Sequence, residues 1–249
     1  MTSPERSFVR YARTGDVIWL TLDRPDRLNA IHMAMRDDLW RMLCLLRDDH
    51  TARVAVVQGA GDRAFSAGAD VLEFGSAPSL LAAREARQGR DLWGLMAALP
   101  IPLIAALHGF AYGAGLELAL YCDLRVAAAD ARFALPEVAL GYIPSAGGTQ
   151  TLHRHIARSE ALRMVLAGEP IGAAEAYATG LVHAVVPRAE LEATARAWAE
   201  RLAACSPAAL RATKRAVVEG LELPLAEGLA LEQRLAAAVA AERAVGRAS

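Results

Sequence analysis

Hydrophobic residues along the chain alternate between short continuous runs and stripes at helical spacing. Two runs, Asp16–Pro25 (DVIWLTLDRP) and Val54–Gly61 (VAVVQGAG), have the composition of strands and stop at a proline or at glycines. Between them, apolar residues recur at helical spacing while charges occupy the other face: Met35, Leu39, Leu43 and Leu46. The segment Ala82–Trp93 predicts a further amphipathic helix. The alternation continues to about residue 190 and predicts an α/β fold.

The stretch Leu92–Leu116 contains no Asp, Glu, Lys or Arg, and it is long enough to cross a membrane. Prolines and glycines interrupt it, however, at Gly94, Pro100, Pro102, Gly109, Gly113 and Gly115. The run IPLIAAL followed by glycines is more typical of a fully buried strand, a turn and a helix. We therefore expect this stretch to lie in a sheet covered on both faces, and we expect no membrane partner.

Helical patterns dominate after Ser159. The segments SEALRMVLAG and AAEAYATG are followed by a long helix that Ser206 and Pro207 begin, because serine is a favoured N-cap and proline a favoured first helical residue. We therefore predict two regions, an α/β core over residues 1–190 and a helical region over residues 191–249.

Composition narrows the classes of function. The chain has 249 residues, is 54% hydrophobic and carries a formal net charge of −1, from 27 Lys and Arg against 28 Asp and Glu. This balance argues against a sequence-independent nucleic-acid binder, which needs a basic surplus. The three cysteines show neither a disulfide framework nor zinc spacing, and the start of the chain lacks the apolar region of a signal peptide. A cytoplasmic location is therefore expected.

The segment VVQGAGDRA matches the G-x-G-x-x-A pattern of a dinucleotide-binding turn. That pattern requires a helix directly after the glycines and an acidic residue at the end of the next strand. Here FSAGAD follows, which is poor helix sequence, and the region about 20 residues further on is helix-like rather than a strand end. We therefore expect no dinucleotide site.

Two glycine clusters, FSAGAD (Phe65–Asp70) and GAGLE (Gly113–Glu117), each follow a predicted buried strand. Small residues let backbone N–H groups approach a ligand closely, and two such groups that converge on one oxygen form an oxyanion hole. Each cluster taken alone is also explained by ordinary turn chemistry.

Two acids stand in apolar surroundings, each beside a glycine-rich turn. Glu117 closes the uncharged stretch, and Glu137 follows Pro136 in FALPEVALGYIPSAGGTQ. Paired carboxylates in a pocket of low dielectric constant can divide the roles of acid and base. Either acid could instead form a salt bridge or cap a helix, and sequence spacing alone does not bring them together. No His, Cys and Asp cluster has metal-ligand spacing, so no metal is expected.

Five motifs occur in order along the chain: RPDRLNAI, AFSAGAD, IPLIAALHGFAYGAGLELALYCDLRVAA, FALPEVALGYIPSAGGTQTL and AGEPIGAAEAYATGLVHAVVP. Together they resemble the enoyl-CoA hydratase/isomerase (crotonase) superfamily, over Val17 to Pro187 and weakly over SPAALRATKRAV. The resemblance implies a crotonase-like spiral of ββα units and a C-terminal helical trimerisation region, hence a homotrimer or a dimer of trimers. It also implies an acyl-CoA thioester as substrate and no cofactor beyond the coenzyme A that the substrate carries.

The resemblance assigns roles by position. The backbone N–H groups of Ala69 and Ala114 would form the oxyanion hole. Glu117 would position and deprotonate water, and Glu137 would deliver a proton to the α-carbon. Further substrate-binding positions implied in the same way are Arg24, Leu28, Ala67, Asp70, Val71, Leu72 and Ser145.

The presence of both glutamates favours the hydration of a trans-2-enoyl-CoA to a 3-hydroxyacyl-CoA. The alternatives are an enoyl-CoA isomerase or another reaction through a thioester enolate, and a non-catalytic protein that binds acyl-CoA or a partner on the same fold. The sequence departs from the family at Leu72, where a lysine is frequent, and at Ser145, where a glycine is frequent. It also ends with ERAVGRAS, which bears on the acyl pocket.

Several other polar residues are expected to be structural. His108 is expected to be a packed, hydrogen-bonded histidine, and His155, like His153, a solvated one. Asp123 is expected to anchor the turn after the helix that carries Glu117. Tyr112 and Tyr142 could either close the pocket or simply pack.

Overall fold

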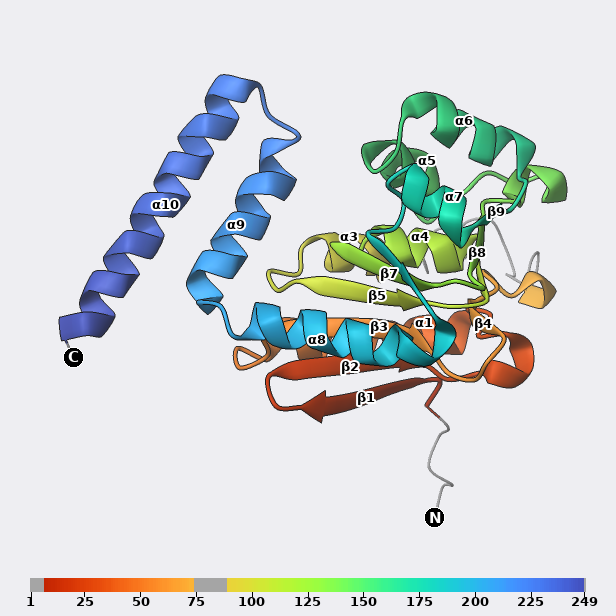
Figure 1. Cartoon of the computed structure of the whole chain (residues 1–249), viewed down its shortest axis with the longest axis horizontal. Coiled ribbons are helices and arrows are strands. Elements are labelled where there is room, and N and C mark those ends of the chain that lie inside the picture. The colour runs from red at the N-terminus through yellow and green to blue at the C-terminus, as the bar shows by residue number, and fades with distance from the viewer. Residues whose placement is uncertain (1–6, 74–88, 249) are drawn as a thin grey trace, which may run out of the picture.

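A computed structural model of the protein describes residues 7–73 and 89–248 (Figure 1). The larger of its two sheets has six strands in the order β1-β2-β3-β5-β7-β10. Only β1 is antiparallel to its neighbour, and the other strands pair in parallel. The strands are β1 (Val9–Thr14), β2 (Val17–Leu22), β3 (Val54–Gly59), β5 (Leu103–Leu107), β7 (Leu124–Ala128) and β10 (Ala184–Val186). The two runs with strand composition thus form β2 and β3, as predicted.

The smaller sheet has four short strands in the order β4-β6-β8-β9. These strands are β4 (Ala64–Ser66), β6 (Phe110–Tyr112), β8 (Arg132–Ala134) and β9 (Ile171–Gly172), with β9 antiparallel to β8. In each of the consecutive strand pairs β3–β4, β5–β6 and β7–β8, the first strand belongs to the large sheet and the second to the small sheet. Helix α4 (Ala114–Leu120) follows β6 directly. This repeated step confirms the predicted spiral of ββα units.

Helices cover both faces of the large sheet (Figure 1). Helix α1 (Met33–Asp48) buries the predicted stripe on one side: Met35, Leu39, Leu43 and Leu46. Helix α8 (Leu191–Ala203) packs on the opposite face through a stripe of small residues and leucine: Leu191, Ala195, Ala199 and Ala203. After α8 completes this second core, the chain continues in α9 (Pro207–Gly220) and α10 (Leu225–Ala248). The predicted division into residues 1–190 and 191–249 stays a prediction, with α8 of the second region packed on the large sheet.

The uncharged stretch forms α3 (Leu92–Ala97), β5, β6 and the start of α4, as its prolines and glycines predict. No helix among the described residues is long and apolar enough to cross a membrane. After β3 the chain enters β4 and not a helix, so the dinucleotide-binding pattern lacks its required context. The helix predicted over Ala82–Trp93 falls mostly on residues 82–88, which lie outside the described residues.

Short helices connect the remaining elements and shape the loops around the smaller sheet. The α-helices are α5 (Gly148–Thr151), α6 (Arg158–Ala167) and α7 (Ala173–Ala178). The 3₁₀ helices are η1 (Pro25–Arg27), η2 (Val71–Glu73), η3 (Glu137–Leu140), η4 (Leu152–Arg154) and η5 (Arg188–Glu190).

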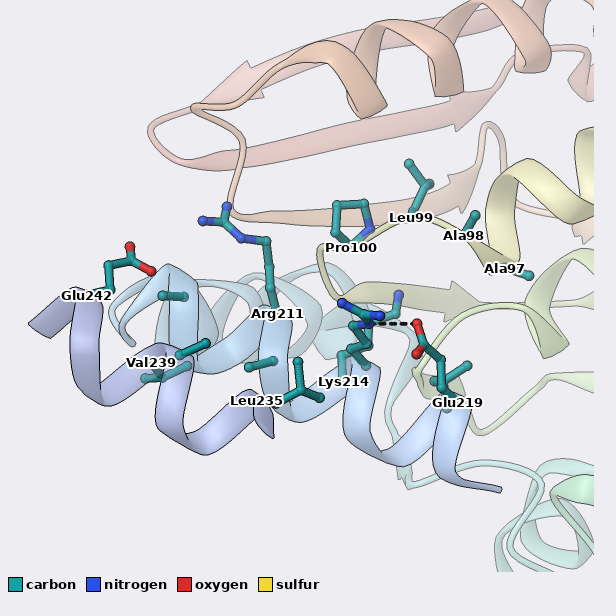
Figure 2. A pocket seen from close by; sticks show the side chains of 15 residues that line it. Ala97, Ala98, Leu99, Pro100, Arg211, Lys214, Glu219, Leu235, Val239 and Glu242 are labelled. Atoms are coloured by element: carbon teal, nitrogen blue, oxygen red, sulfur yellow. Dashed lines mark hydrogen bonds and ion pairs between the residues drawn. The ribbon is translucent and has the colours of Figure 1, made fainter. Parts of the chain in front are cut away.

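Helices α9 and α10 form a hairpin that projects from the sheets (Figure 1). Ser206 caps α9 through a bond from the Ala209 N–H to its hydroxyl, which confirms the predicted start of this helix. Lys214 fastens α9 to the core by donating to the Ile101 carbonyl at 2.9 Å and to the Asp123 carboxylate at 2.8 Å. Figure 2 shows the cleft of about 350 Å³ that lies between this hairpin and the turn at 97–100.

Candidate active site

The two glycine clusters meet where α4 begins. A Cβ atom added to Gly68 would lie 2.8 Å from the Tyr112 carbonyl oxygen and 3.4 Å from the Ala114 nitrogen, so only glycine allows this approach. Gly113, the N-cap of α4, has φ 49 and donates its N–H to the Ala134 carbonyl. The tertiary fold therefore brings the backbone beside Ala69 to the first helical amide, that of Ala114.

The Ala69 amide points away from its strand neighbour. Ile31 pairs with Ala69 in a parallel bridge, in which the Ile31 N–H donates to Gly68 at 2.7 Å and the Asp70 N–H donates to Ile31 at 3.1 Å. In such a bridge the middle residue directs its own N–H to the opposite side. Among the described residues, neither the Ala69 nor the Ala114 amide donates to a protein acceptor.

A buried asparagine supports this loop, and sequence reasoning missed it. The Asn29 side-chain nitrogen donates to the Ala60 and Ala64 carbonyls, both at 2.9 Å, and its oxygen accepts from the Arg24 N–H. The neighbouring Ser66 hydroxyl donates to the Asn29 carbonyl at 2.8 Å and accepts from the Gly68 N–H. Asn29 has a φ angle of 54°, in the left-handed region that asparagine tolerates better than most residues. The asparagine in the motif RPDRLNAI was therefore the sequence signal for this conformation.

Glu117 is fully buried in the first turn of α4, where its charge complements the helix dipole. Its Oε1 atom accepts two backbone bonds, from the Ala146 N–H at 2.8 Å and from the Gly148 N–H at 2.7 Å. A Cβ atom on Gly148 would lie 3.0 Å from that oxygen, so this loop needs a residue without a side chain there. Both bonds engage one oxygen, and Oε2 accepts no backbone bond from the described residues.

Glu137 lies close to Glu117, although twenty positions separate them in the sequence. Burial raises the pKa of Glu117 to about 7, and the Glu137 charge raises it as well, while the two amide bonds act in the opposite direction. Burial also raises the pKa of Glu137, and its Oε2 atom is buried with no partner among the described residues. Its Oε1 atom lies 3.0 Å from the position that a Cβ on Gly113 would take. The two carboxyl groups and the two free amides therefore surround the start of α4.

The remaining predicted positions lie around this centre. Arg24 and Asp70 bind each other at 2.6 Å, and this hydrogen bond lowers the pKa of Asp70. The Ala67 N–H donates to the Leu28 carbonyl, which ties the two motifs together. The exposed positions are Val71, Leu72 and Ser145. The amides that bind the Glu117 carboxylate belong to Ala146 and Gly148, and not to Ser145.

Comparison with known proteins shows the family of this chain. The model of the enoyl-CoA hydratase/isomerase family matches residues 12–247. The chain belongs to the enoyl-CoA hydratase/isomerase family. A curated relative, the 2,3-dehydroadipyl-CoA hydratase of Escherichia coli (strain K12), is 41% identical over 92% of this chain and 89% of its own length. The (E)-benzylidenesuccinyl-CoA hydratase of Thauera aromatica is 39% identical over 87% of this chain and 84% of its own.

Solved structures of the family share the fold. An enoyl-CoA hydratase subunit from Geobacillus kaustophilus HTA426 has a TM-score of 0.89 at 36% identity, covering 96% of this chain and 91% of its own. The enoyl-CoA hydratase from Bacillus anthracis has a TM-score of 0.87 at 36% identity, covering 92% of this chain and 89% of its own. The match over nearly the whole chain confirms the resemblance and the predicted fold class.

The prediction that His155 is solvated is wrong. Its Nε2 atom bonds to the Leu120 carbonyl at 2.9 Å, and its Nδ1 atom accepts from the Arg125 guanidinium at 3.1 Å. Burial, with the charge of Arg125, lowers the pKa of His155 to about 4. The buried Arg125 also donates to the Cys122 carbonyl at 2.6 Å, so this pair holds the carboxyl end of α4. The helical pattern around His155 indicates only which residues lie on the local helix surface. Arg125, which contacts this histidine, belongs to β7 and comes from a distant part of the chain.

Asp123 anchors the chain after α4, as predicted. Its carboxylate accepts from the Leu103 N–H at 2.7 Å and from Lys214 at 2.8 Å. Tyr142 is half exposed, and Tyr112 packs edge-on against Phe110. No cluster of metal-ligating side chains occurs in the described parts of the chain, 7–73 and 89–248.

The raised pKa of Glu117 predicts a pH-dependent stability. Its pKa of about 7 in the folded protein exceeds that of an unfolded glutamate, about 4.3. The folded state therefore binds the Glu117 proton more tightly than the unfolded state does. This proton linkage adds to the free energy of unfolding in full below the unfolded pKa, and the added stability is lost as pH rises through about 7. Glu117→Gln keeps an oxygen for the two amides and carries no charge, so it should escape this loss.

We therefore expect the melting temperature of Glu117→Gln to exceed that of the wild type by an amount that grows from about pH 5 to about pH 8. Calorimetry or circular dichroism measures this difference. Glu160→Gln, at a partly exposed site on α6 where the side chain pairs with Arg163, is the control for the loss of a carboxyl group elsewhere in the chain. A difference that stays constant with pH would contradict the assigned proton linkage.

Proposed function

We propose that this protein adds water across the trans-2 double bond of an enoyl-CoA thioester to give a 3-hydroxyacyl-CoA. The observation that carries the proposal is the joint position of the buried Glu117 and the half-buried Glu137 carboxyl groups, both with raised pKa, beside two backbone amides that have no acceptor among the described residues. Hydration requires one group to accept a proton from water and another to supply a proton to the α-carbon. It also requires stabilisation of the negative charge on the thioester oxygen.

Glu117 is the base in this proposal. Two amides hold its Oε1 atom, which leaves Oε2 to accept a hydrogen bond from water. With a pKa of about 7, the carboxylate is substantially ionised at neutral pH and more basic than an ordinary glutamate. Attack of water on the β-carbon then transfers its proton to Glu117.

Glu137 is the acid. Burial raises its pKa and so favours the protonated form, and its unpartnered Oε2 atom could carry the proton toward the α-carbon. As the bond to water forms, negative charge develops on the thioester oxygen. The Ala69 and Ala114 amides stabilise that charge in the transition state more than in the substrate.

The residues around the carboxylates would bind the coenzyme A part of the substrate. We propose that Leu28, Ala67, Val71, Leu72 and Ser145 contact it, and that the Arg24–Asp70 pair keeps the AGAD turn in place. Carboxyl groups and amides perform all the chemistry described, so we propose no further cofactor. Three free thiols, Cys44, Cys122 and Cys205, support a cytoplasmic location.

Purified protein incubated with crotonyl-CoA tests the activity, through the loss of enoyl absorbance. We expect turnover without added cofactor. A parallel assay with a 3-enoyl-CoA separates hydration from isomerisation, since an isomerase would convert the 3-enoyl ester faster than it adds water to the 2-enoyl ester. Binding of the ester without turnover of either compound would favour a non-catalytic protein.

We also propose that α9 and α10 mediate trimer formation. None of the residues of α9 is buried, and the hairpin exposes apolar side chains that we call the α9–α10 patch: Val217, Val218, Leu221, Leu223, Leu225 and Leu229. Leu221 and Leu225 are 72% and 78% exposed. Several large apolar side chains exposed on one helical hairpin are typical of an interaction surface.

Light scattering at micromolar concentration should therefore give a mass three or six times 26.5 kDa. The double variant Leu221→Glu with Leu225→Glu should shift the mass toward the monomer, because two charges would enter the interface. Leu45→Glu, which changes a leucine 56% exposed on α1, is the matched control. A monomeric wild type with full turnover would count against the patch as an interface.

A further inference from the structure

The side chain of Tyr121 lies beside Glu117 at the carboxyl end of α4. Tyr121 follows Glu117 by four positions, and residues four apart lie on the same face of a helix. Burial raises the pKa of the Tyr121 phenol, and the charges of Glu117 and Asp91 raise it further, as expected for a phenol close to both carboxylates. Tyr121 has no role in the hydration steps proposed above.

The hydroxyl end of Tyr121 packs against Gly147. A Cβ atom added to Gly147 would collide with the phenol oxygen and would lie 3.0 Å from Cζ and 3.2 Å from Cε2, so the tyrosine occupies the space that a side chain would need there. Gly147 has a φ angle of 108°, in the left-handed region that favours glycine. The tyrosine ring therefore rests directly on the backbone at this position.

Gly147 joins the two residues that hold the proposed base. The Ala146 and Gly148 N–H groups donate to Oε1 of Glu117 at 2.8 and 2.7 Å. The Gly147 carbonyl accepts from the Thr151 N–H at 2.8 Å at the start of α5, which contacts α4 (Figure 1). A displacement of Gly147 would therefore move both amides relative to the Glu117 carboxylate.

The ring of Tyr121 is itself supported by Trp93 in α3. The two rings are stacked, with their centroids 5.7 Å apart and an angle of 20° between their planes. Asp91 caps α3 by accepting from the Gly94 N–H at 2.9 Å, which stabilises the start of the helix that carries Trp93. Both aromatic side chains pack against the main hydrophobic core. Tyr121 thus connects the core to the backbone at Gly147.

The loop before Gly147 contributes mostly exposed side chains. Tyr142, Ile143 and Ser145 are exposed, and Gly147 has no side chain of its own. Contacts from outside the loop, such as that of Tyr121, therefore determine where its backbone lies.

We propose that Tyr121 is a positioning residue for the base: it holds Gly147 in place, so that both flanking amides stay on Oε1 of Glu117 and Oε2 stays directed at water. This inference rests on the proposed hydration, in which Glu117 accepts the proton. Tyr121 acts through the loop and touches no reacting atom. A shift of about 1 Å in a catalytic group can cost about 100-fold in rate, so a residue that only supports the base can still control turnover.

Replacement of the ring in the full-length protein tests this role with crotonyl-CoA as substrate. We expect Tyr121→Leu to lower kcat by about 10- to 100-fold, with a smaller change in KM, because the base is misplaced and the residues assigned to the ester are unchanged. Tyr121→Phe keeps the ring that stacks on Trp93 and should retain most of the activity. Tyr11→Leu, which replaces a partly buried tyrosine on β1, is the matched control and should keep full turnover.

The effect of Tyr121→Leu should also depend on the base. In a Glu117→Gln background the same change should cause little further loss of kcat, since the residue acts only through the group already removed. General damage to the structure would instead lower the rate by the same factor in both backgrounds. Equal losses in the two backgrounds, or equal losses in Tyr121→Leu and Tyr11→Leu, would overturn the proposal.

Hydrogen exchange of the Ala146 and Gly148 amides provides a readout that does not depend on turnover. Both amides should exchange at least about tenfold faster in Tyr121→Leu than in the wild type, because the loop opens more readily, and Tyr11→Leu should leave them unchanged. Unchanged exchange in Tyr121→Leu would overturn the positioning role even with hydration confirmed.

Failure of the proposed function gives a different result. If the wild type turns over no enoyl ester, the hydration proposal is wrong, and the exchange of the two amides alone decides whether Tyr121 holds the loop. If Tyr121→Leu does not fold, Trp93→Leu removes the support of the ring and should show the same dependence on Glu117 and the same faster exchange. Its failure to do so would overturn the proposal.

Discussion

Glu117→Gln should lower kcat for enoyl-CoA hydration by about 10²–10⁴-fold, the usual contribution of a positioned acid or base. The glutamine retains an oxygen for the Ala146 and Gly148 amides, so the loop that holds this side chain is preserved. What is lost is the ability to accept a proton from water. Initial rates with crotonyl-CoA, measured on protein whose fold is verified by circular dichroism, give the effect.

Glu137→Gln should lower kcat by a similar factor, because it removes the proton for the α-carbon. The double variant should lose less than the product of the two single losses, because both groups act in one transition state. The affinity for the ester should change little, since neither residue is assigned to the coenzyme A part. Glu160→Gln on α6 serves as the control and should retain full turnover.

The two single variants also separate hydration from isomerisation. An isomerase that shuttles a proton on one carboxylate would lose its activity in one variant and keep nearly all of it in the other. That asymmetric pattern, with faster turnover of the 3-enoyl ester, would overturn the hydratase proposal and leave the fold and the family intact.

The acid side of the pH profile provides a further readout of the same pair. Burial is the first cause of the raised pKa of Glu117, so Glu137→Gln, which is as neutral as the protonated Glu137 that it replaces, should leave the pKa that limits the residual rate at acidic pH well above that of an ordinary glutamate. In the wild type that limb should fall as pH decreases through about 7, because the base becomes protonated.

Ala114→Pro should lower kcat by about 10²–10³-fold, the usual loss when one oxyanion donor is removed. The structure makes this substitution selective. Ala114 is the first residue of α4, a position where proline is well tolerated because its missing N–H is not needed by the helix. The change therefore deletes the amide hydrogen with little cost to the helix.

Ala114→Ser is the matched control, since it retains the amide and should keep most of the activity. Circular dichroism and the melting temperature show whether the proline variant is folded. Affinity for the ester should fall less than kcat, because the amide interacts more strongly with the enolate than with the thioester. Full turnover by a folded Ala114→Pro protein would show that this amide does not stabilise the reaction.

Much of the fold follows from local patterns. The apolar runs that form β2 and β3, the stripe on α1, and the Ser206–Pro207 start of α9 are each encoded by residues close together in the chain. Hydrophobic period and capping chemistry depend on neighbours within a turn or a strand, so sequence alone determines them. The five ordered motifs likewise indicated the spiral and the family, with Glu117 and Glu137 among their residues.

Contacts between distant segments could be decided only by the tertiary structure. The amides that hold Glu117 come from Ala146 and Gly148, about thirty residues away, with separations of 29 and 31 positions. The buried pairing of His155 with Arg125 spans 30 positions, and no local pattern distinguishes that histidine from a solvated one. The closeness of Glu117 to Glu137 and of Gly68 to Ala114 depends on how β4, β6 and β8 pair. Local sequence encodes which surfaces are apolar, whereas pKa values and open amides depend on which segments those surfaces bring together, because burial and electric fields act through space.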